Sequence, residues 1–395
     1  MKSLWNDAVA QPCRSALALR AYTSRLIGGD RSLVLYGGGN TSLKQDGVLH
    51  VKGTGSDLAA VDESGFTALD LHRLRELLAD QRQSDDDIMR RVDTCKLDPA
   101  APRPSIETFL HAAMPHAFIE HTHADAVLAV ANVAEGEAAC AEAFGNLAPV
   151  VPYRHSGAAL ARACKSVFDQ RATPQTIGLV LAFHGVVAFG ATARESYENL
   201  VHLVTMAENF LQKHGAWVTP AAGSQAPDMA AAEKLRVAAS TVAGFPLAMQ
   251  VACTPATLAF ACRPDITEVA LQGPPTPQHA IFTKRIPLLG TDVDAFAAGY
   301  RAYLARTLGP SAKHGIDAAP RIALSPEFGL CAFGVNAHYA GVAAETYSRD
   351  IEIITRASAH GAYRSATESD IARAELEYGG FEQRVRAAAA ADTHS

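Results

Sequence analysis

The sequence predicts an α/β protein of two domains. At 395 residues the chain is longer than one hydrophobic core usually supports. Short β-rich runs alternate along it with segments whose apolar residues recur at helical spacing. The stretch TPAAGSQAPD, at 219–228, is rich in Pro, Ala and Gly and predicts a linker. We therefore expect a first domain at 1–218, a smaller α/β lobe at 229–382 and a low-complexity tail at 383–395.

The composition fits a well-packed globular protein and argues against several kinds of partner. Hydrophobic residues make up 48% of the chain and charged residues 19%. The net charge is -6 and the basic residues are scattered, which argues against nucleic acid. No apolar run is long enough to cross a membrane, and the N-terminus lacks a signal-peptide pattern. The seven cysteines are dispersed without a CxxC pair, so we expect reduced thiols and a cytoplasmic protein.

The first part of the chain reads as a helix followed by a small antiparallel unit. Apolar residues at helical spacing predict a helix at 5–27, and SLVLY at 32–36 predicts a short strand. Asp46-Gly47 predicts a hairpin turn between two strands within 41–53. The leucines of FTALDLHRLRELLA predict a helix over 66–79.

Strands and helices alternate through the rest of the first domain. A helix is expected at 105–115, with Ser105 near its N-terminus. We expect further strands at 117–123, 148–153, 177–183 and 186–190, and further helices at 124–133, 156–168 and 192–215, the last closed by Gly215.

One short internal similarity links the two domains. FHGVVAFG at 183–190 resembles EFGLCAFG at 327–334, and each precedes a long helical pattern. Phe328 takes the place of His184 in the second copy. The similarity indicates either a degenerate partial repeat or a common strand-turn-strand-helix unit that arose twice.

Two histidines at the end of the strand IEHTH are candidate metal ligands. Alternate residues of a strand point to one face, so His121 and His123 present two imidazoles side by side. Such a pair suits a borderline metal such as Zn²⁺. The alternative is two polar residues at a strand end. Glu120 faces the other way and is expected to be structural.

His184 and Glu107 extend this candidate site. His184 stands at a glycine turn after an apolar strand, and three histidines with an open position are typical of catalytic zinc. The alternative is a histidine that bonds its own turn. Glu107 lies near a helix start, where a carboxylate acts as general base or as ligand. Acidic residues also favour the first turn for the helix dipole, although Thr108 occupies the capping-box position.

Two glycine-rich loops are candidate binding loops. YGGGNTS, at 36–42, matches neither a dinucleotide fingerprint nor a P-loop. It is either a flexible strand break or a nest of N–H groups that, with Asn40, holds an oxygen. KGTGSDL, at 52–58, adds the donors Lys52, Thr54 and Ser56.

These motifs, in this order, resemble the class II aldolase/adducin family. The resemblance rests on GGNTS (38–42), KGTG (52–55), PSIE (104–107), HTH (121–123) and HG (184–185). The segments VKGTGSDL, RPSIETFLHAAMP, HTHADAV and QHAIFTKRIPL are most similar to the aldolase region of bacterial rhamnulose-1-phosphate aldolase/short-chain dehydrogenase fusion proteins. No GxGxxG occurs, so we expect the dehydrogenase part to be absent and expect no NAD.

The resemblance implies a fold, a cofactor and a set of site residues. The fold is a three-layer one, with a central, mainly antiparallel sheet flanked by helices. A Zn²⁺ ion, or another divalent metal such as Mn²⁺ or Co²⁺, binds His121, His123 and His184, and Glu107 is the catalytic acid/base. The residues implied to hold the phosphate or the polar end of a substrate are Gly39, Asn40, Lys52, Thr54, Gly55 and Ser105.

The implied reaction is the cleavage of a ketose phosphate or related sugar acid to a dihydroxyacetone-phosphate-like ketone and an aldehyde. A metal-stabilised enediolate carries this chemistry. It also serves epimerases and decarboxylases, which remain alternatives, and an adducin-like binding module without catalysis is an alternative of another class. The family implies a homo-oligomer, with the tetramer as its usual form.

The sequence departs from the family pattern at the substrate side. Ile106 and Gly37 stand where simple family members carry hydroxyl groups, which weakens a phosphate site unless the charge of Lys52 compensates. Tyr153 is the candidate for the family's tyrosine proton donor, against a packing role at a strand end.

Overall fold

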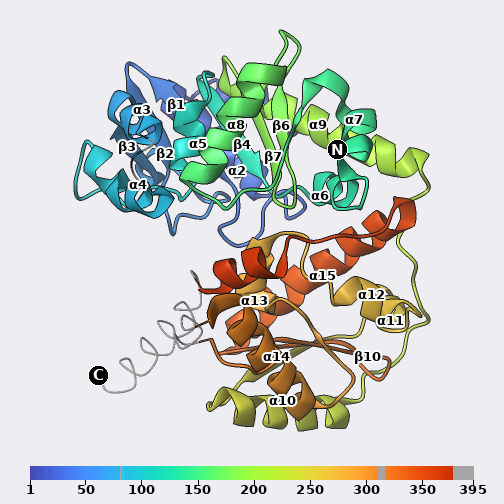
Figure 1. Ribbon diagram of the computed structural model, residues 1–395. Coiled ribbons are helices and arrows are strands. Elements are labelled where there is room, and N and C mark those ends of the chain that lie inside the picture. The colour runs from blue at the N-terminus through green and yellow to red at the C-terminus, as the bar shows by residue number, and fades with distance from the viewer. Residues whose placement is uncertain (81, 83, 310–315, 377–395) are drawn as a thin grey trace. The chain divides into compact units, whose positions relative to one another are not determined.

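The computed structural model describes residues 1–80, 82, 84–309 and 316–376, and the chain divides into two compact units (Figure 1). Unit 1 holds Met1–Ala131 and Glu135–Lys213, and unit 2 holds Asn132–Ala134 and the chain from His214 onward. The stretch 219–228 forms no helix or strand. The tail expected at 383–395 lies outside the described residues. Among the described helices, none has both the length and the apolar character needed to span a bilayer.

A seven-stranded, mainly antiparallel sheet forms the centre of unit 1, in the order β3-β2-β1-β4-β7-β6-β5. Every neighbouring pair is antiparallel except β5 and β6, which are parallel. The central strand β4 therefore has β1 on one side and β7 on the other. The strands are β1 (Asn40–Gln45), β2 (Val48–Lys52), β3 (Phe66–Asp70), β4 (Phe118–Thr122), β5 (Val150–Val151), β6 (Gly178–Leu181) and β7 (Gly185–Gly190).

Helices cover both faces of this sheet and complete the expected three layers. Figure 1 shows α5 (Thr108–Ala113) and α8 (Ala158–Arg171) on the near face, where they share one apolar core with Ile119 of β4. The helices α3 (Leu71–Ala79) and α4 (Asp85–Arg91) extend that layer. The opposite layer holds α2 (Ala16–Gly28), α6 (Asp125–Ala131), α7 (Gly136–Phe144) and α9 (Ala193–Lys213).

The helix expected at 5–27 is interrupted. It forms a short α1 (Asp7–Ala10) and then α2, with Pro12 between them. Proline lacks the N–H that a continuous helix needs. The Ser15 side chain then accepts a hydrogen bond from the Ala18 amide, which starts α2 as an N-cap.

Two other expectations at the start of unit 1 are wrong. SLVLY forms no strand, because the Asp30 side chain accepts from the Ser32 amide and the Asp30 carbonyl accepts from Leu33 and Val34, which makes a turn. The segment expected as a helix over 66–79 begins as β3, which pairs with β2. Asp70 then caps α3, so only the second half is helical.

Other helices and turns of unit 1 also differ from the sequence prediction. The helix expected from Ser105 begins at Thr108, as α5. The helices α4 and α7 and the 3₁₀ turns η1 (Glu63–Gly65), η2 (Val92–Cys95) and η3 (Gly145–Leu147) have no counterpart in the sequence prediction.

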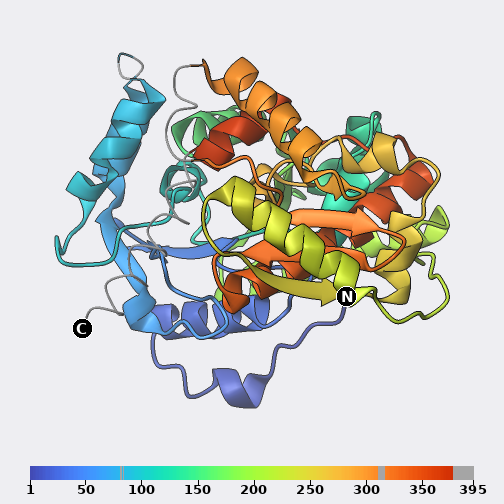
Figure 2. The ribbon, with the colours of Figure 1, turned by 90° about the horizontal axis from the view of Figure 1, so that it is seen from below.

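Unit 2 is built on a four-stranded sheet in the order β8-β11-β10-β9. The long helix α15 (Ala337–His360) packs on the sheet, and Figure 2 shows α10 (Met229–Ala243) crossing it. The strands are β8 (Ala248–Ala252), β9 (Leu288–Leu289), β10 (Ile322–Ser325) and β11 (Gly329–Gly334). The other helices are α11 (Pro255–Ala261), α12 (Ile266–Ala270), η4 (Pro277–His279), α13 (Ala280–Thr283) and α14 (Val293–Leu308).

The unit 2 sheet has the same strand order and pairing sense as the β4-β7-β6-β5 half of unit 1. In each, two antiparallel pairings are followed by one parallel pairing. The turns also match: the His184 amide donates to Leu181 at 3.1 Å, and the Phe328 amide donates to Ser325 at 3.3 Å. The similarity therefore extends beyond the strand pair and helix visible in the sequence.

Candidate metal centre

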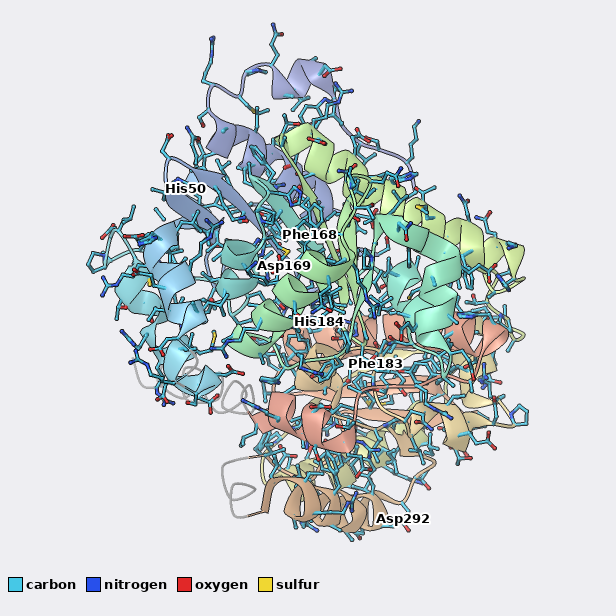
Figure 3. The ribbon with its side chains drawn as sticks, turned by 45° about the horizontal axis from the view of Figure 1, so that its top comes forward. His50, Phe168, Asp169, Phe183, His184 and Asp292 are labelled. Atoms are coloured by element: carbon cyan, nitrogen blue, oxygen red, sulfur yellow. The ribbon has the colours of Figure 1, made fainter. Side chains whose placement is uncertain are left out.

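Three buried histidines of unit 1 come together at the end of β4. His121 lies near the end of the strand, His123 just beyond it, and His184 in the β6–β7 turn. Their candidate ligand atoms all lie within 4.8 Å of one another. Figure 3 labels His184 and its neighbour Phe183 at that turn. The strand pair and the turn thus bring together the three histidines that the sequence singled out.

Glycines allow the turn and the glycine-rich loop to approach β4 closely. Gly185 has a φ of 152°, and a Cβ there would lie 2.1 Å from the Thr122 carbonyl oxygen. Gly39 has a φ of 67°, and its Cβ would lie 2.7 Å from the His121 carbonyl oxygen. L-residues with a side chain rarely adopt such φ values. These two glycines therefore set the approach that places the histidines.

His121 is held in the form that ligates a metal. Its Nδ1 donates to the Val186 carbonyl at 3.1 Å, which leaves the Nε2 lone pair directed into the site. Burial lowers the pKa of His121 to about 4, so the ring is neutral near pH 7. A neutral imidazole nitrogen is the ligand that Zn²⁺ and related ions take.

Glu107 faces two of these rings from the start of α5. Its Oε1 lies 2.9 Å from Nε2 of His184, and its Oε2 lies 3.3 Å from Nε2 of His121. Neither Nε2 atom has a hydrogen-bond partner among the described residues. With its Nδ1–H on Val186, His121 turns a nitrogen lone pair toward a buried carboxylate, and these two repel one another unless a cation lies between them. The donor set therefore fits a divalent metal ion.

The carboxylate itself is anchored by neighbouring polar groups. Asn40 donates its Nδ2–H to Oε2 at 2.6 Å, and Ser156 donates to Oε1 at 3.4 Å. Burial alone would raise the pKa of Glu107, but the imidazoles of His121 and His184, in their protonated form, hold that pKa well below its usual value. The buried carboxylate is therefore an anion wherever this site carries positive charge.

Glu120 occupies the opposite face of β4, as expected. It forms a buried ion pair with Arg20 of α2 at 2.7 Å and accepts a hydrogen bond from Ser196 of α9. The alternation of the strand thus separates the structural glutamate from the histidines.

The residues expected to bind the substrate lie in two paired segments next to Glu107. The Ser105 amide donates to the Lys52 carbonyl, and the Thr54 hydroxyl donates to the Pro104 carbonyl at 3.1 Å. Burial lowers the pKa of Lys52, although Asp57 and Glu107 raise it. Gly55 has a φ of 88° and open space around it. The substrate roles of these residues and of Gly39 and Asn40 remain predictions.

Tyr153 lies in the loop 152–157 that also carries Ser156. Its ring centroid lies 6.5 Å from that of Phe183, the residue next to His184. Its role as proton donor remains a prediction.

Three polar side chains around Glu107 and its partner Asn40 were given no role by the sequence, although Ser42 belongs to the GGNTS motif: Ser42, His111 and Ser156. His111 follows Glu107 by four residues on α5, a spacing that puts both on one helix face. That spacing could have identified His111. Ser156 lies in an irregular loop, and only the three-dimensional structure brings it to the carboxylate.

The comparisons with known proteins agree with this architecture. The family model for the class II aldolase and adducin N-terminal domain matches residues 18–211, and the one for the second domain of class II aldolase matches residues 226–384. A curated relative, the uncharacterized oxidoreductase YuxG of Bacillus subtilis, is 27% identical over 94% of this chain. The chain spans 58% of the length of that relative.

Solved structures with the same kind of domain cover about half of the chain. The N-terminal class II aldolase domain of a conserved Thermoplasma acidophilum protein is 34% identical, with a TM-score of 0.49, and covers 53% of this chain and 99% of its own. L-Fuculose-1-phosphate aldolase from Thermus thermophilus is 16% identical, with a TM-score of 0.36, and covers 52% of this chain and 96% of its own. With both family models matched in succession, the chain belongs to the class II aldolase and adducin family.

Proposed function

We propose that unit 1 is a metal-dependent carbon–carbon lyase of the aldolase type. The observation that carries the proposal is the buried cluster of His121, His123 and His184 with the Glu107 carboxylate 2.9 Å from His184. The substrate class is a ketose phosphate or a related sugar acid. The products are a ketone like dihydroxyacetone phosphate and an aldehyde.

His121, His123 and His184 would hold a divalent metal, which when bound would supply a Lewis acid for the oxygens of a ketose substrate, and Zn²⁺ suits three imidazole donors. Glu107 takes the proton from the hydroxyl group on the carbon that becomes the aldehyde. The carbon–carbon bond then breaks and its electron pair stays on the ketone fragment. That fragment recovers a proton at carbon, so a single group that accepts and returns a proton suffices. Burial excludes water from this transfer.

The substrate end of the site combines one cation with polar donors. Lys52 is buried beside Glu107, and Ser105 lies in the segment that leads into the same carboxylate. An ammonium group in such surroundings favours an anionic substrate, either a phosphate or a carboxylate. Thr54 and Gly55 complete this rim. Asn40 uses one amide N–H for Glu107, and its second N–H is the one available to a substrate oxygen.

Metal analysis followed by a substrate panel tests the proposal. The purified protein is expected to contain a divalent metal and to release an aldehyde from at least one ketose 1-phosphate or sugar acid. Full activity after exhaustive metal removal would contradict it. Product stereochemistry separates cleavage from epimerisation, and evolved CO₂ reports decarboxylation. An intact, metal-free protein without any turnover would favour the binding module. Sedimentation velocity tests the expected homo-oligomer.

We further propose that unit 2 is a degenerate copy of the metal-bearing half of unit 1. The strand registers place Val251 at the position of His121, Cys253 at that of His123 and Phe328 at that of His184. Valine and phenylalanine cannot ligate a metal, so this copy has no equivalent centre. One metal ion per chain is the expected stoichiometry. Two ions per chain, with the second retained in His121→Ala, would contradict this proposal.

A further inference from the structure

A row of four buried polar side chains begins at the Glu107 carboxylate and ends at Ser42. Asn40 donates to Glu107 Oε2 at 2.6 Å, the Asn40 amide oxygen bonds Nε2 of His111, and Nδ1 of His111 lies 2.7 Å from the Ser42 hydroxyl. None of the four residues is more than 4% exposed. His111 and Ser42 have so far been given no role.

Hydrogen-bond chemistry fixes the direction of this row. An ionised carboxylate only accepts, so Asn40 must turn its NH₂ group to Glu107 and its oxygen to His111. His111 must then carry its proton on Nε2, and its bare Nδ1 accepts from the Ser42 hydroxyl. Burial lowers the pKa of His111 well below its usual value, with Lys44 as the next cause, so the ring is neutral. Each of the three hydrogen bonds in the row thus has one donor and one acceptor, and no alternative orientation satisfies all three.

The row combines alternate residues of a strand with residues one helical turn apart. Asn40 and Ser42 are alternate residues of β1 and share one face of the sheet. Asn40 pairs with His121 across β1 and β4, so this is also the face of the metal-site histidines. His111 lies one helical turn after Glu107 on the α5 segment. Helix and strand therefore meet at the Asn40–His111 contact.

The row distinguishes the two oxygens of Glu107. Oε2 is occupied by the amide of Asn40, whereas Oε1 has only the longer contact with Ser156 and faces His184. We propose that Ser42, His111 and Asn40 are positioning residues that anchor Oε2 and leave Oε1 as the oxygen that accepts and returns the substrate proton. This inference rests on the proposed aldolase function and assigns its acid/base step to one atom.

Substitution of His111 separates positioning from packing. His111→Gln keeps an N–H that can donate to the Asn40 amide oxygen, whereas His111→Leu fills the space without a donor. Loss of a group that orients a catalytic residue is expected to lower kcat by about 10–100-fold. We expect that loss in the Leu variant, partial recovery in the Gln variant, and KM within about twofold of the wild type in both. A packing role alone would give the two variants equal kcat.

Ser42→Ala is the milder variant if the Leu protein does not fold, and Ser24→Ala is its matched control. Ser24 is also a fully buried hydroxyl and bonds Thr41, but on the opposite face of β1. Ser42→Ala is expected to lower kcat several-fold, and Ser24→Ala to leave kcat unchanged. Equal effects of the two substitutions would overturn the inference.

Two readouts do not depend on turnover. A crystal structure of His111→Leu is expected to show the Asn40 amide or the Glu107 carboxylate rotated, while the metal content stays at the wild-type level. An unmoved carboxylate would overturn the positioning role. If the wild type cleaves no ketose phosphate or sugar acid, the proposed function fails, yet the crystal structure still decides whether His111 orients Glu107.

Discussion

Nε2 of His184 lies 2.9 Å from Oε1 of Glu107, although one residue comes from the β6–β7 turn and the other from the start of α5. Both side chains are buried, and the His184 nitrogen has no hydrogen-bond partner among the described residues. A divalent metal ion is proposed to bind at this contact, so the first experiments concern the ion itself.

His121→Ala is expected to abolish tight metal binding. His121 is one of the three histidines proposed to hold the ion, and its Nδ1 bond to Val186 fixes the orientation of the ring. Mass spectrometry of the purified protein should show a fall from one metal per chain to a trace. His72→Ala, at an exposed position on α3, is the control and should keep the full metal content. Equal metal content in both variants would exclude His121 as a ligand.

Metal removal is expected to destabilise unit 1. An ion that binds only the folded state stabilises it by about 2.7 kcal/mol when its free concentration is one hundred times Kd. Thermal melting before and after chelation, with Zn²⁺, Mn²⁺ and Co²⁺ added back separately, measures this effect. The His121→Ala protein should show no shift with any of them. A wild-type melting temperature that is insensitive to all three ions would contradict the metal site.

Glu107→Gln should separate metal binding from turnover. The amide keeps the size of the side chain but cannot take a proton near neutral pH. We expect kcat to fall by about 10²–10⁴-fold, the usual contribution of an acid/base group. Metal content should remain at the wild-type level, since the histidines are intact. A variant that retains activity would place the acid/base elsewhere, with Tyr153 as the next candidate.

Gly185→Ala should disrupt the candidate metal centre, although Gly185 is not one of the proposed ligands. The new Cβ would lie 2.1 Å from the Thr122 oxygen at a φ of 152°, so the turn that carries His184 must move. We expect a loss of about 3 kcal/mol in unfolding free energy, together with loss of the metal. Gly215→Ala is the control, because its φ of 68° is also strained but its surroundings are open. That variant should lose about 1 kcal/mol and keep the metal.

Glu375 is expected to make the folding stability of unit 2 depend on pH. Burial raises the pKa of this carboxyl group to about 7, and Tyr300 donates a hydrogen bond to it. The unfolded chain loses this proton near pH 4.5, so between these values the folded state binds more protons and its stability falls as pH rises.

The free energy of unfolding is therefore expected to fall by about 3 kcal/mol on going to pH 8. This figure follows from the difference between the folded and unfolded pKa values of Glu375. Glu375→Gln should remove this loss, as measured by denaturant titrations at pH 5 and pH 8. The exposed Glu268→Gln should leave it unchanged. Identical pH profiles in all three proteins would contradict the assignment.

Local rules predicted the parts of the site that depend on local geometry. Asp46 and Gly47 both have positive φ, at 51° and 78°, as the predicted hairpin turn requires. The alternation of β4 correctly separated the histidines from Glu120. SLVLY failed because its β-propensity was overridden by hydrogen bonds that its backbone amides donate to Asp30.

Long-range contacts limited the rest of the prediction. Ser156 reaches Glu107 across a loop whose conformation no spacing encodes. The correspondence between the two sheets was also underestimated, because it resides in strand order and hydrogen-bond register. His121 and Val251 occupy equivalent register positions in the two sheets, but their side chains are chemically unlike. A comparison of residue types therefore does not reveal that the two positions correspond.

The absence, among the described strands, of any partner beyond β8 in the unit 2 sheet has an evolutionary consequence. In unit 1 the half shared by both sheets carries the candidate metal ligands, whereas the added strand β1 carries Asn40 and Ser42. A copy that lacks this strand could regain a metal site through three histidine substitutions. It would still have no positioning residues to anchor a carboxylate that transfers protons. Under the proposed function, the metal ligands and the residues that anchor Glu107 thus come from different strands, and an ancestor with only the shared half is expected to have bound metal before it acquired acid/base catalysis.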